Sequence, residues 1–154
     1  TTQPEFTSFD SRDAINECLN ILEDFTQQRN INFITSIIAH DIFADLTKFK
    51  QVIFSLTNNM IKFANDNDII YITSYINKAH FILEFKNRMH KYLDSDFKNQ
   101  NDIYYFNKQS ADLSVIKKII KQHNGTVKFL LEKSTNTIIL RLSLPLVEND
   151  CHNN

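Results

Sequence analysis

The stretch Asp45–Ala64 constrains the fold of this chain most, because it carries a regular apolar stripe. Its apolar residues recur at spacings of three and four, the pattern of a helix that buries one face. The stripe consists of Phe49, Val52, Ile53, Leu56, Met60 and Phe63. We therefore predict a helix over Asp45–Ala64 whose apolar face packs on the core of the domain.

Three polar residues border this stripe and form a candidate binding site. Ser55, Asn59 and Lys62 stand at positions i, i+4 and i+7, so their side chains project from neighbouring turns toward the same side. An Asn oxygen is a suitable ligand for Mg²⁺, and a Lys one turn away can neutralise phosphate oxygens. Such residues at a helix border are also common as solvated surface residues. Asn59 continues an apolar row, where an unpaired amide would cost roughly 1–3 kcal/mol, and this favours a binding role.

Length and composition indicate one soluble, cytoplasmic domain. The chain has 154 residues, 42% of them hydrophobic, and no apolar run is long enough for a membrane span. The start of the chain lacks the pattern of a signal peptide. Lys and Arg number 17 against 18 Asp and Glu, without a basic block. Neither nucleic-acid binding nor direct membrane contact is expected.

Cysteine and glycine are both scarce. Cys18 falls on an apolar helical face and Cys151 lies in a polar tail, so neither a disulfide framework nor a zinc site is expected. Gly125 is the only glycine, whereas a chain of this length usually has about ten. We expect Asn, which tolerates left-handed backbone, to replace glycine in several turns. A biased genome composition is an alternative explanation for the many Asn residues.

The remaining periodicity predicts alternating strands and helices. Before the Asp45–Ala64 helix we expect a strand at Glu5–Phe9, a helix at Ser11–Gln28 capped by Ser11, and a strand at Asn32–Ile38. After it we expect a hairpin containing Ile70, Ile72, Phe81, Leu83 and Phe85, a polar segment at 86–110 with aromatic residues Tyr104, Tyr105 and Phe106, a helix at Leu113–His123 ended by Asn124 and Gly125, and a last hairpin closed by Pro145. This order predicts an α/β (α+β) two-layer sandwich: a mixed, mostly antiparallel sheet covered on one face by three helices.

The Asp45–Ala64 stretch also resembles a known motif, the N box of the ATP-binding domain of sensor histidine kinases. The usual form of that box is D-x-x-R-L-x-Q-V-L-x-N-L-L-x-N-A-I-K-F-T, and this chain reads DLTKFKQVIFSLTNNMIKFA. The matching residues are Asp45, Gln51, Val52, Leu56, Asn59, Ile61, Lys62 and Phe63. Ser55 replaces the first Asn of the box. The predicted order of elements likewise resembles the ATPase (Bergerat-like) fold that these kinases share with gyrases and a family of chaperones.

The resemblance implies a place in a two-component phosphorelay, with ATP and Mg²⁺ as ligands and Asn59 as the metal ligand. It implies a histidine-kinase-like ATPase domain over residues 1–147 and a C-terminal tail or linker over 148–154. The phospho-accepting histidine of the family lies outside this domain, so we expect His123 to be a packed residue at a helix end. The implied partners are the helical dimerisation and phosphoacceptor hairpin of the same or a partner kinase, and a receiver domain.

The first glycine box of the family is altered in this chain. Its pattern V-x-D-x-G-x-G-I aligns with FKNRMHKY at 85–92, and no glycine remains. Asn87 aligns with the Asp that accepts a hydrogen bond from the adenine amino group, and its amide oxygen can still accept. Met89 and Lys91 align with glycines that let the backbone approach the nucleotide. Their side chains are therefore expected to fill part of the pocket.

The second glycine box and the lid are altered as well. The pattern G-L-G-L-x-I-V-K aligns with SADLSVIK at 110–117. Free N–H groups at a helix N-terminus bind anions, but the carboxylate of Asp112 competes for these groups and repels phosphates. The phenylalanine box corresponds to Ile103–Phe106, and only NKQ separates it from the second glycine box. The lid over the nucleotide is therefore essentially missing.

Three classes of function stay open. The retained framework and altered boxes favour a pseudokinase domain, in which nucleotide binding is weak or lost and signalling proceeds by domain docking. The alternative is an active ATP-dependent protein-histidine kinase domain, a transferase that binds nucleotide through Ser55, Asn59, Lys62 and Asn87. The third class is an unrelated enzyme. For that class the sequence offers no nucleophile with a base, no metal-spaced His/Cys cluster and no catalytic carboxylate pair.

Overall fold

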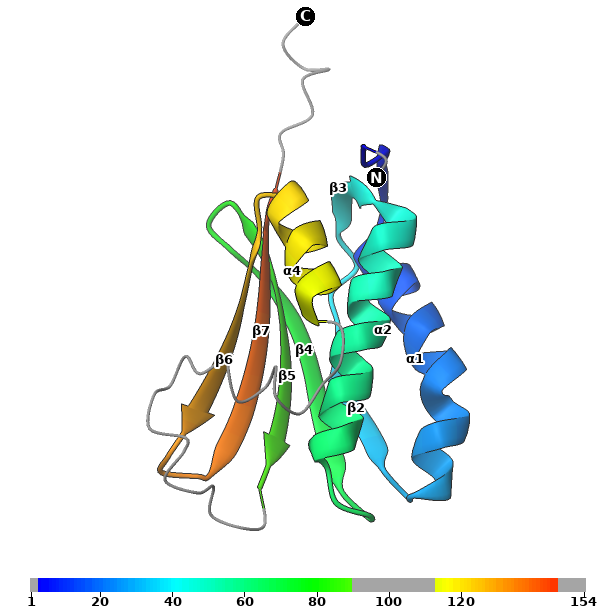
Figure 1. Cartoon of the computed structure of the whole chain (residues 1–154), viewed down its shortest axis with the longest axis vertical. Helices are drawn as coiled ribbons and strands as arrows, with labels where there is room; N and C mark the ends of the chain where they lie inside the picture. Colours follow the sequence, from blue (N-terminus) through cyan, green and yellow to red (C-terminus); the bar gives the residue numbers. More distant parts are fainter. Residues whose placement is uncertain (1–2, 90–112, 147–154) are drawn as a thin grey trace, which may run out of the picture.

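The computed structural model describes residues 3–89 and 113–146, and the elements below lie in these ranges. They are β1 (Phe6–Asp10), α1 (Ser11–Gln28), β2 (Asn32–Ser36), β3 (Asp41–Asp45), α2 (Leu46–Phe63), β4 (Ile69–Asn77), β5 (His80–Arg88), α4 (Leu113–Gln122), β6 (Thr126–Glu132) and β7 (Thr137–Pro145). The three helices form one layer and a five-stranded sheet forms the other (Figure 1). The predicted two-layer α/β sandwich is confirmed.

The five-stranded sheet has the order β2-β4-β5-β7-β6. β2 runs parallel to β4, and the other neighbours are antiparallel, as expected for a mixed, mostly antiparallel sheet. A separate ribbon pairs β1 with β3, from Phe6 opposite Asp45 to Asp10 opposite Asp41. β3 was not predicted, because its short segment reads as the approach to a helix and only pairing with β1 makes it a strand. The predicted strand at 32–38 ends at Ser36.

Helix α2 forms where the apolar stripe predicted it. Its five inner residues Phe49, Val52, Ile53, Leu56 and Met60 are at most 3% exposed. Phe63, at the end of the stripe, is half-buried against the ring of Phe129. Each fully buried side chain of this size contributes about 1.5–3 kcal/mol of transfer free energy. Asp45 and Ala64, placed inside the predicted helix, are its caps instead.

Helix α1 has the predicted bounds but a different cap. The carboxylate of Asp10 accepts a hydrogen bond from the Asp13 N–H at 3.0 Å, so Asp10 is the N-cap. Ser11, predicted as the cap, is the first helical residue, and its buried hydroxyl donates to the Ile38 carbonyl at 3.1 Å. Asp and Ser are both good caps, so the sequence could not separate the two. The contact with Ile38 decides between them.

Asparagine takes over the left-handed backbone positions, as the composition predicted. In the described residues, positive φ angles of 53° to 66° occur at Asn30, Asn67, Asn124 and Asn136, and one further such angle, 54°, at Lys78. Gly125 has no positive φ, so Asn124 alone ends α4 in the left-handed manner. A Cβ on Gly125 would lie 2.6 Å from the Ser143 carbonyl oxygen. The single glycine is therefore needed for close approach of two backbones.

Other sequence predictions meet the structure only in part. The aromatic residues at 104–106, Lys91, Asp112, Cys151 and the tail at 148–154 lie outside the described residues. Cys18 is buried, and burial raises the pKa of its thiol to about 11. In the described ranges, no helix is long and apolar enough to cross a membrane. The same ranges contain no group of three or more His, Cys, Asp or Glu that could hold a metal ion.

Candidate functional site

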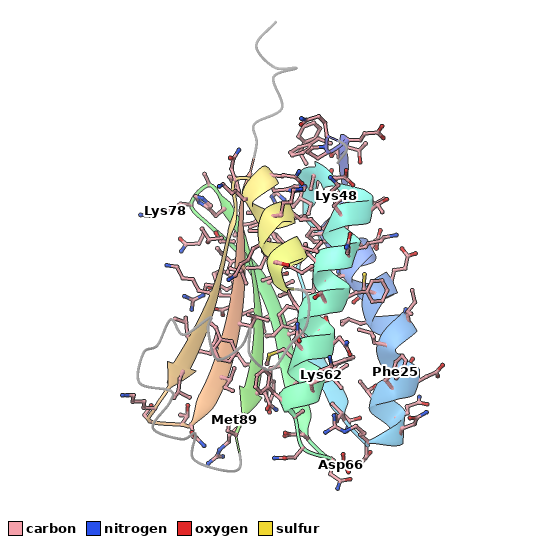
Figure 2. All side chains as sticks on the ribbon, viewed as in Figure 1. Phe25, Lys48, Lys62, Asp66, Lys78 and Met89 are labelled. Atoms are coloured by element: carbon pink, nitrogen blue, oxygen red, sulfur yellow. The ribbon has the colours of Figure 1, made fainter. Side chains whose placement is uncertain are left out.

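Helix α2 places the predicted residues Ser55, Asn59 and Lys62 on successive turns, with different exposure. Ser55 is half-buried, Asn59 is 4% exposed and Lys62 is exposed. The Asn59 Nδ2 donates to the Ser55 carbonyl at 2.9 Å. This bond commits the amide nitrogen, so Asn59 Oδ1 is the atom of this side chain that suits a cation. Lys62 and Met89 lie toward the same end of the molecule in Figure 2.

Asn87 lies on the helix-covered face of β5 and is 1% exposed. Its Nδ2 donates to Asp68 Oδ2 at 3.1 Å and to the Ile69 carbonyl at 3.0 Å. A carboxylate and a carbonyl only accept hydrogen bonds, so these two neighbours fix which way the amide points. Asn87 Oδ1 is buried and has no hydrogen-bond partner among residues 3–89 and 113–146. An unpaired buried acceptor of this kind costs about 1–3 kcal/mol, and a ligand donor would recover that energy.

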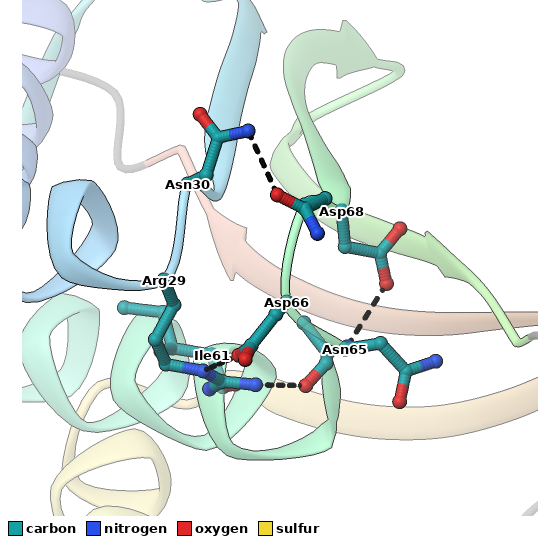
Figure 3. A network of polar contacts seen from close by, with 8 residues as sticks. Arg29, Asn30, Ile61, Asn65, Asp66 and Asp68 are labelled. Carbon is teal, nitrogen blue, oxygen red and sulfur yellow. Dashed lines mark hydrogen bonds and ion pairs between the residues drawn. The ribbon is translucent and has the colours of Figure 1, made fainter.

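A polar network holds the turn that contains Asp68 (Figure 3). The Arg29 guanidinium donates to the carbonyls of Ile61, at 2.6 Å, and Ala64, and it pairs with Asp66 at 2.8 Å. Asp68 accepts from the Asn65 N–H at 3.1 Å. These bonds satisfy the last carbonyls of α2, which have no partner inside the helix. The network therefore fixes the carboxylate that orients Asn87.

Met89 follows β5 and closes the described part of the first glycine box. Its N–H donates to the Asn136 carbonyl at 2.8 Å, and its carbonyl accepts from Asn136 Nδ2 at 3.0 Å. The side chain is half-buried and packs on the core. Met89 thus occupies space beside Asn87's strand where a glycine would leave an opening.

A groove of about 510 Å³, here called the helix-layer groove, lies beside Ser55. It is lined by α1, α2 and α4 through Leu22, Phe25, Gln51, Phe54, Ser55, Asn58, Val115 and Ile116. Phe25 is 61% exposed and Val115 is 44% exposed. None of the described lining residues is charged. The groove joins Ser55 to the first turn of α4, whereas Asn59, Lys62 and Asn87 do not line it.

His123, expected to be a packed residue at a helix end, is 7% exposed and stacks on Phe6 with ring centroids 4.8 Å apart. Its Nδ1 lies 2.8 Å from the Ile119 carbonyl, which only accepts, so Nδ1 carries the proton. Its Nε2 then accepts from the Asp45 N–H at 3.1 Å. Burial opposes ionisation of Asp45, but hydrogen bonds from the Lys48 and Glu5 N–H groups outweigh it and hold the pKa of that carboxyl below its ordinary value. This cluster is structural.

Comparison with solved structures identifies the fold. The catalytic domain of histidine kinase ThkA, in a nucleotide-free form, has a TM-score of 0.76 and 23% identity, and the match covers 92% of this chain and 96% of that one. Full-length ShkA in complex with AMPPNP has a TM-score of 0.78 and 11% identity, covering 96% of this chain and 32% of that one. This chain has the fold of a histidine kinase catalytic domain. The resemblance seen in the N box is confirmed at the level of the fold.

Sequence comparison adds a partial match to this histidine-kinase-type domain. No family model matches the chain. The adaptive-response sensory kinase SasA of Prochlorococcus marinus is 43% identical over 54 residues, which are 34% of this chain and 14% of that kinase. The chain therefore matches a small part of that relative. ThkA has also been solved in complex with the response regulator protein TrrA.

The structure adds two residues to the site that the sequence did not single out. Asp68 lies in the turn cluster Asn65–Asp68 and is 8% exposed, although most Asp residues in such turns are solvated. Arg29 follows α1 and reaches the end of α2, which is distant in sequence. In the sequence, Asp68 stands directly before the apolar start of β4, and this was the one signal that could have identified it. No local pattern indicated Arg29.

Proposed function

We propose that this chain is the ATP-binding-type domain of a two-component sensor histidine kinase, in which nucleotide binding is weak or lost and signalling proceeds by domain docking. The histidine kinase fold and the partial match to SasA support the assignment to this class. In this proposal residues 1–147 form a cytoplasmic domain and residues 148–154 form a tail or linker. It is a pseudokinase within its family.

The helix-layer groove carries this proposal. By the resemblance, Ser55 and the start of α4 flank the phosphates of a bound nucleotide. A triphosphate needs cations or several charge-assisted donors. The groove at this place instead presents Phe25, Phe54 and Val115, with only neutral polar groups beside them. The described lining therefore offers no cation to phosphates at the Ser55 end of the candidate site, while Asn59, Lys62 and Asn87 lie outside the groove. The exposed apolar side chains fit an amphipathic helix laid into the groove.

The docking partner in this proposal is the helical dimerisation and phosphoacceptor hairpin of the same or a partner kinase. Such a hairpin presents apolar residues at i, i+3 and i+4, which match a groove lined by side chains from three helices. A receiver domain is a second partner in this proposal, because the structurally similar ThkA has been solved with a response regulator.

The second candidate is an active ATP-dependent kinase domain, and the unpaired oxygen of Asn87 favours it. In that candidate, Asn87 Oδ1 accepts from the adenine amino group, Asn59 Oδ1 coordinates Mg²⁺ and Lys62 neutralises phosphate oxygens. When bound, ATP supplies the phosphoryl group that is transferred. A single amide ligand suits Mg²⁺ because this ion keeps several waters and binds phosphates directly.

Titration calorimetry with ATP and Mg²⁺ separates the two candidates. We expect the wild type to bind with a dissociation constant of about 1 mM or weaker, since losing a few charge-assisted hydrogen bonds of roughly 1.5–3 kcal/mol each removes micromolar affinity. Asn59→Ala should then change little. Asn20→Ala, at an exposed position on α1, is the matched control. Low-micromolar binding that Asn59→Ala abolishes and Asn20→Ala preserves would reject the pseudokinase and support the active kinase.

A further inference from the structure

The sheet face opposite α1, α2 and α4 (Figure 1) carries a second groove, of about 450 Å³, here called the open-face groove. It is lined by Tyr71, Lys86, Arg88, Glu132, Ser134, Thr135 and Thr137. Side chains alternate between the two faces of a strand, so Lys86 and Arg88 point away from Asn87, which lies between them on β5. The open-face groove is therefore separate from the candidate nucleotide site.

The sheet register assembles this groove from residues that are scattered in sequence. Tyr71 of β4 is opposite Lys86 of β5, and Arg88 of β5 is opposite Thr137 of β7. Directly opposite residues on one face lie close enough for their side chains to interact. Tyr71 is 43% exposed, so its side chain is accessible to a ligand. The groove thus sets an aromatic platform beside two cations.

The cations on this face exceed the carboxylate that pairs with them, because the single Glu84 carboxylate is shared by Arg141 and Lys86. Glu84 forms its shorter ion pair with Arg141, at 2.6 Å, and a longer one with Lys86, at 3.8 Å. In the described residues Arg88 makes no ion pair. Hydroxyl groups lie on the other side of Arg88, where Thr135 Oγ1 donates to Thr137 Oγ1 at 2.9 Å. Cations beside hydroxyl donors are the groups that bind phosphate oxygens.

We propose that the open-face groove binds a small molecule that carries both an aromatic ring and a phosphate monoester. The ring of the ligand stacks on Tyr71, and its phosphate lies between Lys86 and Arg88. The Thr137 hydroxyl exchanges its long bond to the Thr135 carbonyl, at 3.4 Å, for one to the phosphate. Glu132 of β6 lies opposite Thr137 of β7 at the edge of the groove. Its negative charge repels the phosphate and keeps it on the β5 side. Nucleoside monophosphates and phosphotyrosine both contain this combination of ring and phosphate.

Phenyl phosphate is the probe that tests the proposal, titrated into the full chain and followed by amide chemical shifts. We expect shifts at residues 86–88 and 134–137, with residues 55–62 unchanged. Inorganic phosphate and phenol, which each lack one half of the probe, should bind about tenfold more weakly. Adenosine monophosphate and O-phosphotyrosine are titrated next. Binding of either at least as tightly as phenyl phosphate supports the proposal and shows which source of ring and phosphate the groove prefers, whereas failure of both to bind overturns it.

Four single variants sharpen the test. Arg88→Ala should weaken phenyl phosphate binding about tenfold and Tyr71→Ala about fivefold. Glu132→Gln should tighten it, because it removes a repulsive charge. Lys128→Ala, a matched control at an exposed cation on the same face outside the groove, should change it by less than about twofold. Equal binding of inorganic phosphate and phenyl phosphate, or equal losses in Arg88→Ala and Lys128→Ala, would overturn the proposal.

Discussion

The two ends of helix α2 are both tied to distant parts of the chain, but they leave different atoms unpaired. At the N-terminal end, the Asp45 carboxylate accepts from the Lys48 and Glu5 N–H groups, and the Asp45 N–H donates to His123. At the C-terminal end, Arg29 binds the last carbonyls of the helix, and Asp68 in the following turn binds Asn87. Only at this second end does a buried side-chain atom, Asn87 Oδ1, lack a partner among the described residues.

This difference separates a structural cluster from a candidate binding position. Buried polar groups are normally paired, because leaving one without a partner costs a large fraction of the marginal stability of a domain. The cluster around Asp45 pairs its buried polar groups and so fastens the β1–β3 ribbon to the helices. The cluster around Asn87 leaves one buried acceptor without a donor among the described residues. Its stability depends on Arg29 and Asp68, neither of which touches that acceptor in the structure.

The largest expected effect comes from the middle of α2, which both ends serve to position. Leu56→Ala should lower the free energy of unfolding by about 2–5 kcal/mol, because Leu56 is 0% exposed and the substitution leaves a cavity. Urea denaturation measures the change, with Asn58→Ala, exposed on the same helix, as the control. A change near zero would contradict the packing of this face.

Arg29→Met tests the C-terminal end. The variant keeps an aliphatic side chain but removes the hydrogen bonds to Ile61 and Ala64, so we expect a loss of about 1–3 kcal/mol after allowing for partial exposure to solvent. Arg12→Met, at an exposed position of α1, should change stability by no more than about 0.5 kcal/mol. Equal losses in the two variants would mean that the network does not secure the end of α2.

Asn87→Asp restores the residue type of the family motif and should nevertheless destabilise the domain. The new carboxylate would lie within about 3 Å of Asp68, and two such groups cannot both ionise without cost. One pKa is then raised above its unfolded value, so the stability deficit grows as pH rises from about 4 to about 7, reaching about 1–2 kcal/mol.

Denaturation at several pH values measures this deficit. The control is Asn77→Asp, at an exposed position at the end of β4. A variant as stable as the wild type at neutral pH would show that Asp68 does not restrict this position.

Asp45→Ala tests the N-terminal end and should have the smallest effect, about 0.5–2 kcal/mol for loss of the helix cap. The pKa of Asp45 is below its ordinary value, so its stabilisation is present above the unfolded pKa of about 3.9 and is lost as pH falls through the folded value. The difference between wild type and variant should therefore shrink in acid. A difference that is constant down to pH 2 would contradict the role assigned to the charge.

Local patterns in the sequence were sufficient for most of the architecture. The apolar stripe of α2, the bounds of α1 and both hairpins follow from side-chain periodicity, because burial of one face repeats with the geometry of the element. Asparagine at left-handed turns likewise followed from composition. The four candidate residues could also be named from the sequence, three by spacing on a helix and Asn87 through a motif.

The sequence by itself determined the layers of this domain and the residue types at its candidate site. Tertiary structure alone decided which partners those residues have. Asn87 and Asp68 are 19 residues apart, and Arg29 and Ile61 are 32 apart, so no local pattern could pair them. Sequence charge also gave no sign of the open-face groove, since the formal net charge is −1 while the register of β4, β5 and β7 brings Tyr71, Lys86 and Arg88 together. Contacts between distant strands depend on how the whole sheet assembles, and that assembly is a property of the folded chain.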